Sequence, residues 1–233
     1  MSTYILIHGA FQGKWCWEKV KYSLEQKNHH VIAVDLPGSG EDMTPPQEVT
    51  LKSYTDKVIA VLEKVDSPVI LVGHSMAGVV ISQVAEYLPK KIQRLVYVSA
   101  IVPQNGQSLQ DIMGDGGPKA IFNKTEKTLT LIDEYIVNEF FNECSEEDAT
   151  AARRKMRPQP VLPFNGKVVL TEKNFGRVPC VYIETTKDHA IPVEAQREMY
   201  RQNSFDDVFS IDADHAPFFS QPENLTKYLH DIS

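Results

Sequence analysis

Short apolar runs rich in β-branched residues alternate with longer segments of helical periodicity along most of this 233-residue chain. Continuous apolar strands imply burial on both faces, and alternation with helices favours a parallel sheet covered by helices on each side. The expected fold class is therefore α/β with a mostly parallel central sheet. Six runs are predicted to be its strands, at residues 4–8, 30–35, 69–73, 94–100, 180–186 and 207–213.

Helices are predicted between these strands from the spacing of apolar residues. Segment 51–65 follows Thr50, a favourable N-cap, and segment 76–88 ends at Pro89, which lacks a backbone donor. Residues 192–202 and 222–231 are two further candidates. With 42% hydrophobic residues, a chain of this length can bury one sizeable core, so a single domain is expected.

One region interrupts the alternation. Residues 103–178 are richer in glycine, proline, asparagine and charge, and they contain amphipathic stretches at 131–141 and 145–156. A structureless loop of this length is unusual inside an α/β domain, and the aromatic and aliphatic content argues against a disordered insert. We expect an inserted lid at 103–178 over a core formed by residues 1–102 and 179–233.

The composition argues against several classes of partner. The formal net charge is −7 without long like-charge runs, which disfavours binding to nucleic acid or to an anionic membrane. Cys16, Cys144 and Cys180 form no C-x-x-C pair, so neither a disulfide framework nor a zinc ribbon is indicated. With no signal-peptide pattern and no apolar run of membrane-spanning length, a cytoplasmic protein is expected.

Ser75 stands in the most informative motif, GHSMA at 73–77, between a strand candidate and a helix candidate. The motif approaches the G-x-S-x-G nucleophile elbow, in which a strained strand-to-helix turn exposes the serine hydroxyl. Ala77, followed by Gly78, departs from the strict pattern. The alternative interpretation is that Ser75 only caps the following helix, since serine is a favoured N-cap.

A serine hydroxyl is a weak nucleophile at neutral pH, so it needs a base and an acid that orients the base. In nucleophile-elbow folds the acid follows the serine in the chain and the histidine comes last. His215 follows the last strand candidate, and Asp188 follows the strand candidate before it. Both are therefore expected at the carboxyl edge of the sheet, where such folds hold their chemistry.

Other acids and bases are available but fit less well. His189 adjoins Asp188, but it precedes no further strand that could supply its own acid. Four more aspartates could serve as the acid, although the last two stand too close to His215 in sequence to orient it easily: Asp206, Asp207, Asp212 and Asp214.

An oxyanion hole usually consists of two backbone N–H groups aimed at the developing negative charge. One belongs to the residue after the nucleophile, here Met76, and the other to a loop after an early strand. The loop that begins His8-Gly9-Ala10 allows close backbone approach, so the N–H of Ala10 or of Phe11 is expected to complete the hole. The alternative is a simple glycine turn.

Five stretches carry a family resemblance: LIHGAFQGKWCWEKV, VIAVDLPGSG, LVGHSMAGVVIS, YIETTKDHAIP and DADHAPFFSQPENL. They resemble the α/β-hydrolase superfamily and, more narrowly, the branch of plant methylesterases, hydroxynitrile lyases and bacterial esterase relatives. The resemblance implies an α/β-hydrolase fold with an inserted cap, and a homodimer is plausible on the same ground. It assigns Ser75 as nucleophile, His215 as base, Asp188 as acid, and the N–H groups of Ala10 and Met76 as the oxyanion hole.

Three positions separate the esterases of this branch from its lyases. Lyases resembling this chain carry threonine or asparagine where Gly9 stands; one type also has glutamate in place of His74 and lysine in place of Ala216. None of those lyase residues is present, so the esterase pattern fits better. A hydroxynitrile lyase and a non-catalytic small-ligand receptor on the same fold are the alternatives.

The predicted function is a serine esterase that cleaves small carboxylic esters, such as methyl or aryl esters, through an acyl-enzyme. No cofactor is expected, and the histidines show no metal-ligand spacing. The expected partner is a small-molecule ester. Substrate contacts are predicted for Phe11, His74, Phe122 and Phe218, and the wider set of candidate pocket residues adds Phe140, Phe141, Met156 and Phe164.

Overall fold

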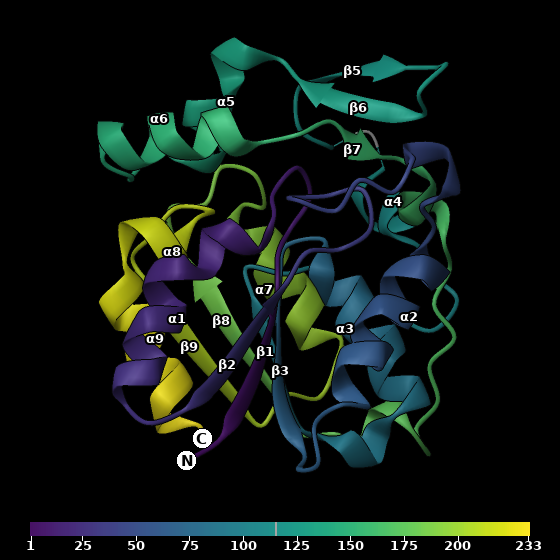
Figure 1. The fold of residues 1–233 in the computed structure, drawn as a ribbon, viewed down its shortest axis with the longest axis vertical. Helices are drawn as coiled ribbons and strands as arrows, with labels where there is room; N and C mark the ends of the chain where they lie inside the picture. Colours follow the sequence, from purple (N-terminus) through teal and green to yellow (C-terminus); the bar gives the residue numbers. More distant parts are fainter. Residues whose placement is uncertain (115) are drawn as a thin grey trace.

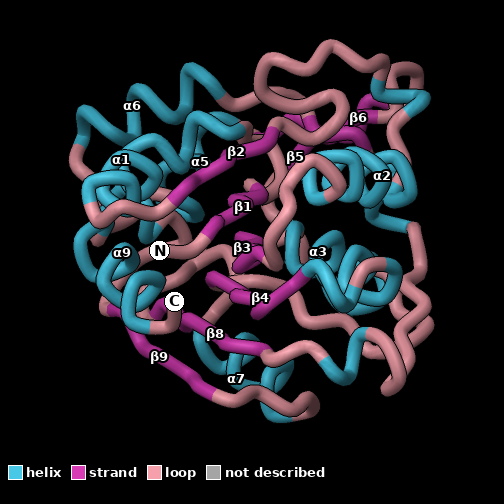
Figure 2. Tube along the Cα trace, turned by 60° about the horizontal axis from the view of Figure 1, so that its bottom comes forward, coloured by secondary structure: helices cyan, strands magenta, loops and turns pink. Residues whose placement is uncertain are grey.

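The computed structural model describes residues 1–114 and 116–233. Its larger sheet has six strands, all parallel, in the order β2-β1-β3-β4-β8-β9 (Figures 1 and 2). All six predicted strands are present with small shifts at their ends, and the expected α/β class is confirmed. They are β1 (Thr3–Ile7), β2 (His30–Val34), β3 (Val69–His74), β4 (Ile92–Val98), β8 (Cys180–Thr185) and β9 (Asp207–Ile211).

Helices cover both faces of this sheet. On one side lie α1 (Glu18–Gln26), α8 (Pro217–Ser220) and α9 (Pro222–Asp231). On the other lie α2 (Leu51–Leu62), α3 (Ala77–Tyr87) and α7 (Val193–Arg201). Figure 2 shows α1 and α9 on one side of the six strands and α2 and α3 on the other.

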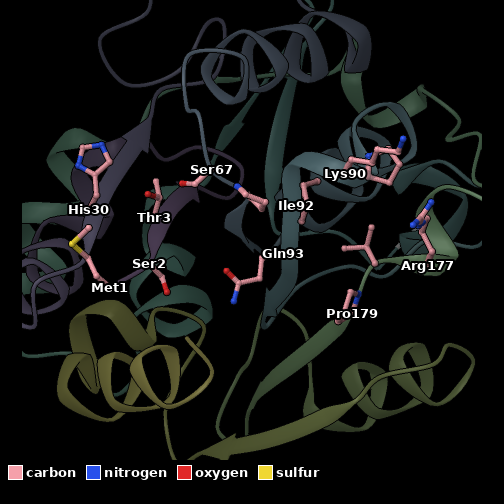
Figure 3. Close-up of a pocket in the computed structure, with 13 residues that line it drawn as sticks. Met1, Ser2, Thr3, His30, Ser67, Lys90, Ile92, Gln93, Arg177 and Pro179 are labelled. Carbon is pink, nitrogen blue, oxygen red and sulfur yellow. The ribbon is translucent and has the colours of Figure 1, made fainter.

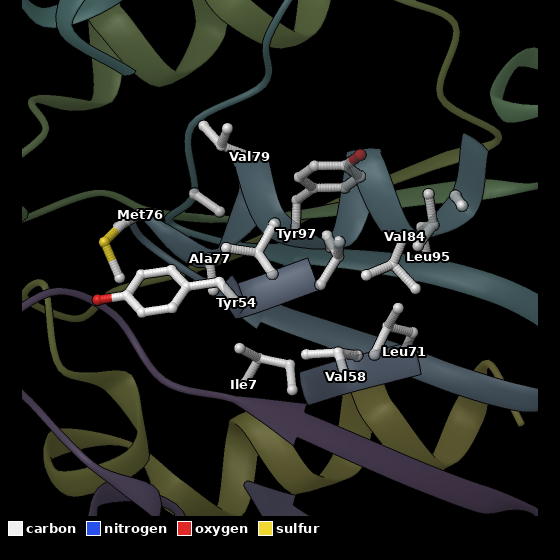
Figure 4. Packing of buried hydrophobic residues seen from close by; sticks show 14 of the residues in the cluster. Ile7, Tyr54, Val58, Leu71, Met76, Ala77, Val79, Val84, Leu95 and Tyr97 are labelled. Atoms are coloured by element: carbon white, nitrogen blue, oxygen red, sulfur yellow. The ribbon is translucent and has the colours of Figure 1, made fainter. Parts of the chain in front are cut away.

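The period of two along each strand explains why the predicted strands are apolar throughout. In β1, Ile5 and Ile7 point into the core beneath α2 and α3, whereas Tyr4 and Leu6 point into the core beneath α1 and α9. Figure 4 shows the first of these cores, where Ile7 lies close to Val58 of α2. Every second side chain therefore enters a separate hydrophobic core.

Local sequence signals set the helix ends. At the start of α2, the Thr50 hydroxyl accepts from the Ser53 N–H at 3.1 Å, and the Ser53 hydroxyl accepts in return from the Thr50 N–H. The predicted N-cap at Thr50 is thus confirmed. Helix α3 ends at Tyr87, two residues before Pro89, as the proline predicts.

The segment predicted to be a lid contains regular structure above the carboxyl edge of the sheet (Figure 1). The two amphipathic stretches form α5 (Asp133–Phe140) and α6 (Glu146–Lys155). A short helix and a small antiparallel sheet were not predicted: α4 (Leu109–Met113), β5 (Ala120–Asn123), β6 (Thr128–Leu131) and β7 (Gln159–Pro160).

The C-terminal part of the predicted lid segment does not lie over the carboxyl edge of the sheet. Val168 and Leu170 are buried in the core that contains α2 and α3, and the carboxylate of Glu86 on α3 accepts from the N–H of Thr171 at 2.8 Å and of Phe175 at 3.2 Å. The division into core and lid stays a prediction, but its last part packs along α3 and not over the catalytic edge.

Five single-turn 3-10 helices complete the described secondary structure: η1 (Lys14–Trp17), η2 (Pro46–Glu48), η3 (Pro89–Lys91), η4 (Leu162–Asn165) and η5 (Phe175–Arg177). Across residues 1–114 and 116–233, no helix has both the length and the apolar character needed to cross a bilayer.

Candidate active site

Ser75 occupies a strained turn between β3 and α3. Its φ angle is 54°, a left-handed value that non-glycine residues rarely adopt. The turn is held by hydrogen bonds: the Ser75 N–H donates to the Val98 carbonyl at 3.2 Å, and the Ser75 carbonyl accepts from the N–H groups of Gly78 and Ile101 at 3.1 Å each. These are the features of a nucleophile elbow.

The close packing of the turn explains the departure from the strict motif. A Cβ at Gly73 would lie 3.0 Å from the Ala77 carbonyl oxygen, and one at Gly78 would lie 2.0 Å from the Ile101 carbonyl oxygen. Ala77 is fully buried and carries its methyl group without displacing the turn. The strict requirement for glycine thus falls on position 78 and not on position 77.

His215 links Ser75 to Asp188. Its Nε2 lies 2.9 Å from the Ser75 hydroxyl, and its Nδ1 lies 2.7 Å from Oδ2 of Asp188. The histidine and the aspartate are almost completely buried. The structure therefore brings together the three residues that the sequence assigned to nucleophile, base and acid, from loops after β3, β9 and β8.

The Asp188 carboxylate is fixed by neighbouring donors. Its Oδ1 accepts from the N–H groups of Ala190 and Ile191 at 2.8 Å each, and its Oδ2 accepts from the Thr185 hydroxyl at 3.1 Å and from Nε2 of Gln196 at 3.2 Å. Donors to both oxygens hold the carboxylate in a single orientation toward His215. Gln196 lies on α7, and no motif in the sequence pointed to it.

The alternative acids and the alternative base are placed elsewhere. Asp214 is buried, but its Oδ2 accepts from the Glu143 N–H at 2.9 Å and its Oδ1 from the Ser220 hydroxyl at 2.7 Å. His189 is exposed, with Nδ1 2.8 Å from the Asn138 carbonyl oxygen. Neither residue contacts the Ser75 hydroxyl.

The two N–H groups expected for the oxyanion hole face the same pocket as the serine. Ala10 and Met76 line it together with Ser75 and His215. In the part of the chain that the structure describes, neither the Ala10 nor the Met76 N–H has a hydrogen-bond acceptor. The Phe11 N–H, the alternative donor, already donates to Oε1 of Gln159 at 3.0 Å. The geometry thus favours Ala10 over Phe11.

The pocket above Ser75 is apolar and narrow, with a volume of about 40 Å³. Apart from Ser75 and His215, its lining consists of Ala10, Phe11, Met76, Ile101, Leu109, Met113, Pro118, Phe140, Phe164, Ala190 and Ile191. Phe11, Phe140 and Phe164 were among the predicted pocket residues. Lid and core therefore both contribute to the pocket.

The other predicted pocket residues do not line it. Phe122 is 52% exposed on the β5 strand, because the unforeseen hairpin turns it to solvent. Phe141 and Phe218 are buried in the core beside α1 and α9, and Met156 packs against that core as well. The sequence could not separate core aromatics from pocket aromatics, since both are apolar.

His74 supports the base and does not face the pocket. Its Nε2 donates to the His215 carbonyl at 2.7 Å, and its ring lies 4.9 Å from that of Phe218. Burial lowers the pKa of His74 well below its ordinary value, so the ring is neutral at physiological pH. The predicted substrate contact of His74 is therefore wrong, because the side chain lies beneath the His215 loop.

A larger cavity than the pocket at Ser75 lies at the opposite edge of the sheet (Figure 3). It has a volume of about 780 Å³ and is lined by His30, Lys90 and Arg177 among others. No carboxylate lines it in the described part of the chain, so no acid could orient His30 as a base. Since parallel α/β sheets hold their chemistry at the carboxyl edge, we assign the site to the smaller pocket.

The described residues contain no group of three or more histidine, cysteine, aspartate or glutamate side chains arranged to hold a metal ion. At this edge the structure brings together a serine, a histidine and an aspartate beside the N–H groups of Ala10 and Met76.

Comparisons with known proteins identify the family of this chain. The model of the alpha/beta hydrolase family matches residues 4–227. Putative methylesterase 13, chloroplastic, from Arabidopsis thaliana is 35% identical over 249 residues, covering 100% of this chain and 56% of that protein, so the chain spans about half of this relative. Methylesterase 7 from Arabidopsis thaliana is 33% identical over 250 residues, covering 100% of this chain and 96% of the relative.

A solved structure supports the same family. The crystal structure of polyneuridine aldehyde esterase superposes with a TM-score of 0.87 at 29% identity, covering 100% of this chain and 99% of that one. These relatives support a carboxylic ester hydrolase. The chain therefore belongs to the alpha/beta hydrolase family, in its plant methylesterase-like branch.

Proposed function

We propose that the protein hydrolyses small carboxylic esters with Ser75 as nucleophile, His215 as general base and Asp188 as the acid that orients the base. One observation carries this proposal: an unbroken hydrogen-bonded chain from the Ser75 hydroxyl through His215 to a buried carboxylate, at the floor of an apolar pocket. The names of the relatives, which include methylesterases and an esterase, agree with it.

In the first half of the reaction, the Ser75 oxygen attacks the ester carbonyl carbon while Nε2 of His215 takes the hydroxyl proton. The carbonyl oxygen becomes an oxyanion that accepts from the N–H groups of Ala10 and Met76. When the intermediate collapses, the bond to the alkoxy group breaks and the leaving alcohol takes the proton from the imidazolium. An acyl-Ser75 ester remains.

In the second half, His215 removes a proton from water, and the resulting hydroxide equivalent attacks the acyl carbon. Collapse of the second intermediate releases the carboxylic acid and returns the proton to the Ser75 oxygen. Asp188 accepts the Nδ1 hydrogen bond of His215 throughout, which orients the ring and stabilises the imidazolium.

The pocket favours an uncharged group next to the scissile bond, because apart from Ser75 and His215 its lining is apolar. Its volume of about 40 Å³ favours a small group, such as a methyl, at this position. A cytoplasmic location, a homodimer and the absence of nucleic-acid and membrane partners stay predictions from the sequence.

The test is covalent labelling with a fluorophosphonate, read by intact-protein mass, together with acid release from methyl acetate. Wild type is expected to gain one adduct and to hydrolyse the ester, whereas Ser75→Ala does neither. Ser67→Ala, an exposed serine at the opposite edge of the sheet, is the matched control and should behave as wild type. Full ester turnover by Ser75→Ala, or an adduct on another serine, would overturn the proposal.

A further inference from the structure

Asp214 is a buried carboxylate that takes no part in the proposed proton transfers. It stands directly before His215 in the chain, but the ring of His215 contacts Asp188 instead. Asp214 is 0% exposed, and burying an ionisable side chain is costly unless its oxygens are hydrogen-bonded. The donors that its two oxygens find therefore show which parts of the molecule this residue holds together.

One oxygen of Asp214 holds the loop that carries the base. Oδ1 accepts from the Ala216 N–H at 3.1 Å and from the Ser220 hydroxyl at 2.7 Å. The first of these bonds joins a side chain to the N–H two positions further on, which closes a tight turn around His215. Oδ1 therefore fixes the backbone of residues 214–216, which we call the histidine loop.

The other oxygen of Asp214 binds a segment that is distant in sequence. Oδ2 accepts from the Glu143 N–H at 2.9 Å and from the Cys144 thiol at 3.2 Å. Both donors belong to residues 138–144, the end of helix α5 and the turn after it, which we call the α5 turn. Figure 1 shows α5 above the carboxyl edge of the sheet. A single carboxylate thus connects the α5 turn to the histidine loop.

The Cys144 thiol keeps the proton that it donates. Burial, followed by the charge of Asp214, raises the pKa of this thiol well above its ordinary value. The sulfur therefore stays protonated at physiological pH and acts as a donor, although a weak one. All four donors to Asp214 are uncharged groups. Withdrawing one of them leaves a buried oxygen short of partners, so the α5 turn and the histidine loop resist separation.

The α5 turn also contacts the base and the loop that carries the acid. The Phe140 ring lines the catalytic pocket, and its centroid lies 5.5 Å from that of the His215 ring. Nδ2 of Asn142 donates to the Lys187 carbonyl at 3.0 Å, one residue before Asp188. The position of the α5 turn is therefore tied to the two catalytic residues that act on the serine.

We infer that Asp214 is a positioning residue, which couples the α5 turn to the histidine loop and so sets the placement of His215 against Ser75. The inference rests on the proposed function, since it concerns the base of that reaction. With both oxygens of Asp214 occupied, Nε2 of His215 lies 2.9 Å from the Ser75 hydroxyl. Without the donors of the α5 turn, the histidine loop is held from one side only. Proton transfer then slows, because small displacements of a catalytic group cost much of its rate.

Two substitutions interrupt this connection from opposite ends. Cys144→Ala removes one donor without a change of charge, and Asp214→Asn replaces one acceptor oxygen by an amide NH₂ group that faces other donors. We expect kcat for methyl acetate to fall about threefold in the first and about tenfold in the second, with KM nearly unchanged. Cys144→Ser keeps a donor at the same place and is expected to retain the wild-type kcat.

Cys180→Ala and Asp66→Asn are the matched controls. Cys180 is a buried cysteine whose thiol donates to the Val178 carbonyl at 3.3 Å, and Asp66 is an exposed aspartate. Neither residue contacts the α5 turn or the histidine loop through a hydrogen bond in the described part of the chain. Both controls should therefore keep the wild-type kcat.

Hydrogen exchange, read by mass spectrometry, tests the coupling without a substrate. Cys144→Ala changes the α5 turn but is expected to speed amide exchange in the histidine loop as well. Asp214→Asn is expected to speed exchange in both segments. A residue that served only local packing would change exchange in its own segment alone.

The outcomes separate this inference from the proposed function. Wild-type kcat in folded Cys144→Ala and Asp214→Asn, or equal losses in Cys144→Ala and Cys144→Ser, would overturn the inference, while fluorophosphonate labelling of Ser75 upholds the esterase. If wild type takes no label and cleaves no ester, the proposed function fails. Wild-type exchange in the histidine loop of Cys144→Ala then overturns the coupling too, and faster exchange there upholds it. Where Asp214→Asn does not fold by circular dichroism, the two Cys144 variants give the same test.

Discussion

Gly9 lies directly against the imidazole of His74. A Cβ at position 9 would be 2.8 Å from Nδ1 of His74 and 2.9 Å from Cβ of Ser75, closer than real Cβ contacts come. This approach brings the Ala10 N–H to the pocket that Ser75 faces. It also gives a physical reason against the lyase alternative, because a threonine or asparagine at position 9 would collide with the histidine present at position 74.

We predict that Gly9→Ala destabilises the protein by about 1–3 kcal/mol, because the added methyl must displace His74 or the serine turn. Ester hydrolysis should fall as the Ala10 N–H moves. Urea denaturation and kcat/KM on methyl acetate measure the two effects. Gly117→Ala is the stability control, since a Cβ there meets its nearest atom at an ordinary 3.8 Å. Equal stability of Gly9→Ala and wild type would contradict the prediction.

Asp188→Asn is expected to lower kcat about 10⁴-fold, because the amide favours the wrong tautomer of His215. The same exchange at Asp212, a surface residue 3.0 Å from the Lys187 ammonium, is the control and should change kcat little. Steady-state kinetics on methyl acetate give kcat for the two variants and for wild type. Comparable losses in the two variants would refute the assignment of Asp188 as the acid.

Gln196 is a positioning residue in the same network. We predict that Gln196→Met lowers kcat with little change in KM, because the pocket lining is intact while Asp188 loses one donor. The unfolding free energy should fall by at least about 2 kcal/mol, since the Thr185 N–H and the Ile191 carbonyl lose buried partners. Gln47→Met, at an exposed site, is the control. An increase in KM with unchanged kcat would argue for direct substrate contact instead.

Phe140 and Phe122 make a matched pair of lid aromatics. Phe140→Leu changes the pocket wall, so KM for methyl acetate or the preference between esters should shift, whereas Phe122→Leu removes surface area from an exposed side chain and should shift neither. The check is kcat and KM for a series of small esters. An equal effect of both substitutions would show that the hairpin reaches the substrate.

Buried histidines make the stability of the folded protein depend on pH. Burial lowers the pKa of both His8 and His74 below the ordinary value near 6.5, so the unfolded chain binds protons that the folded chain does not. The contribution of these histidines to the free energy of unfolding is therefore complete above about pH 6.5. Below that pH the free energy of unfolding falls, by up to about 1.4 kcal/mol per pH unit for each histidine.

The measurement is urea denaturation between about pH 5 and pH 7, above the range in which most carboxyl groups titrate. His74→Gln removes one of the histidines whose pKa is lowered, a set that also includes His29. Its stability should therefore fall less steeply with decreasing pH than that of wild type, whatever its stability at neutral pH. Parallel curves for the two proteins would show that His74 does not contribute.

The local pattern of the chain was enough to predict the main sheet and the catalytic groups. Each central strand buries both faces, so its apolar run stands out, and the fixed chain order of serine, acid and histidine leaves few candidates for each role. Thr50 and Pro89 set helix ends through interactions within a few residues of themselves. Such signals are local, and the sequence carries them directly.

What the tertiary structure decided depends on contacts between distant segments. The sequence left open whether Ala10 or Phe11 supplies an N–H, and the choice follows from Gln159, which is 148 positions from Phe11 and occupies its donor. The buried amide of Gln196 and the outward turn of Phe122 arise in the same way. Apolar residues follow the same pattern whether they fill a core or line a pocket, so only packing in three dimensions separates the two.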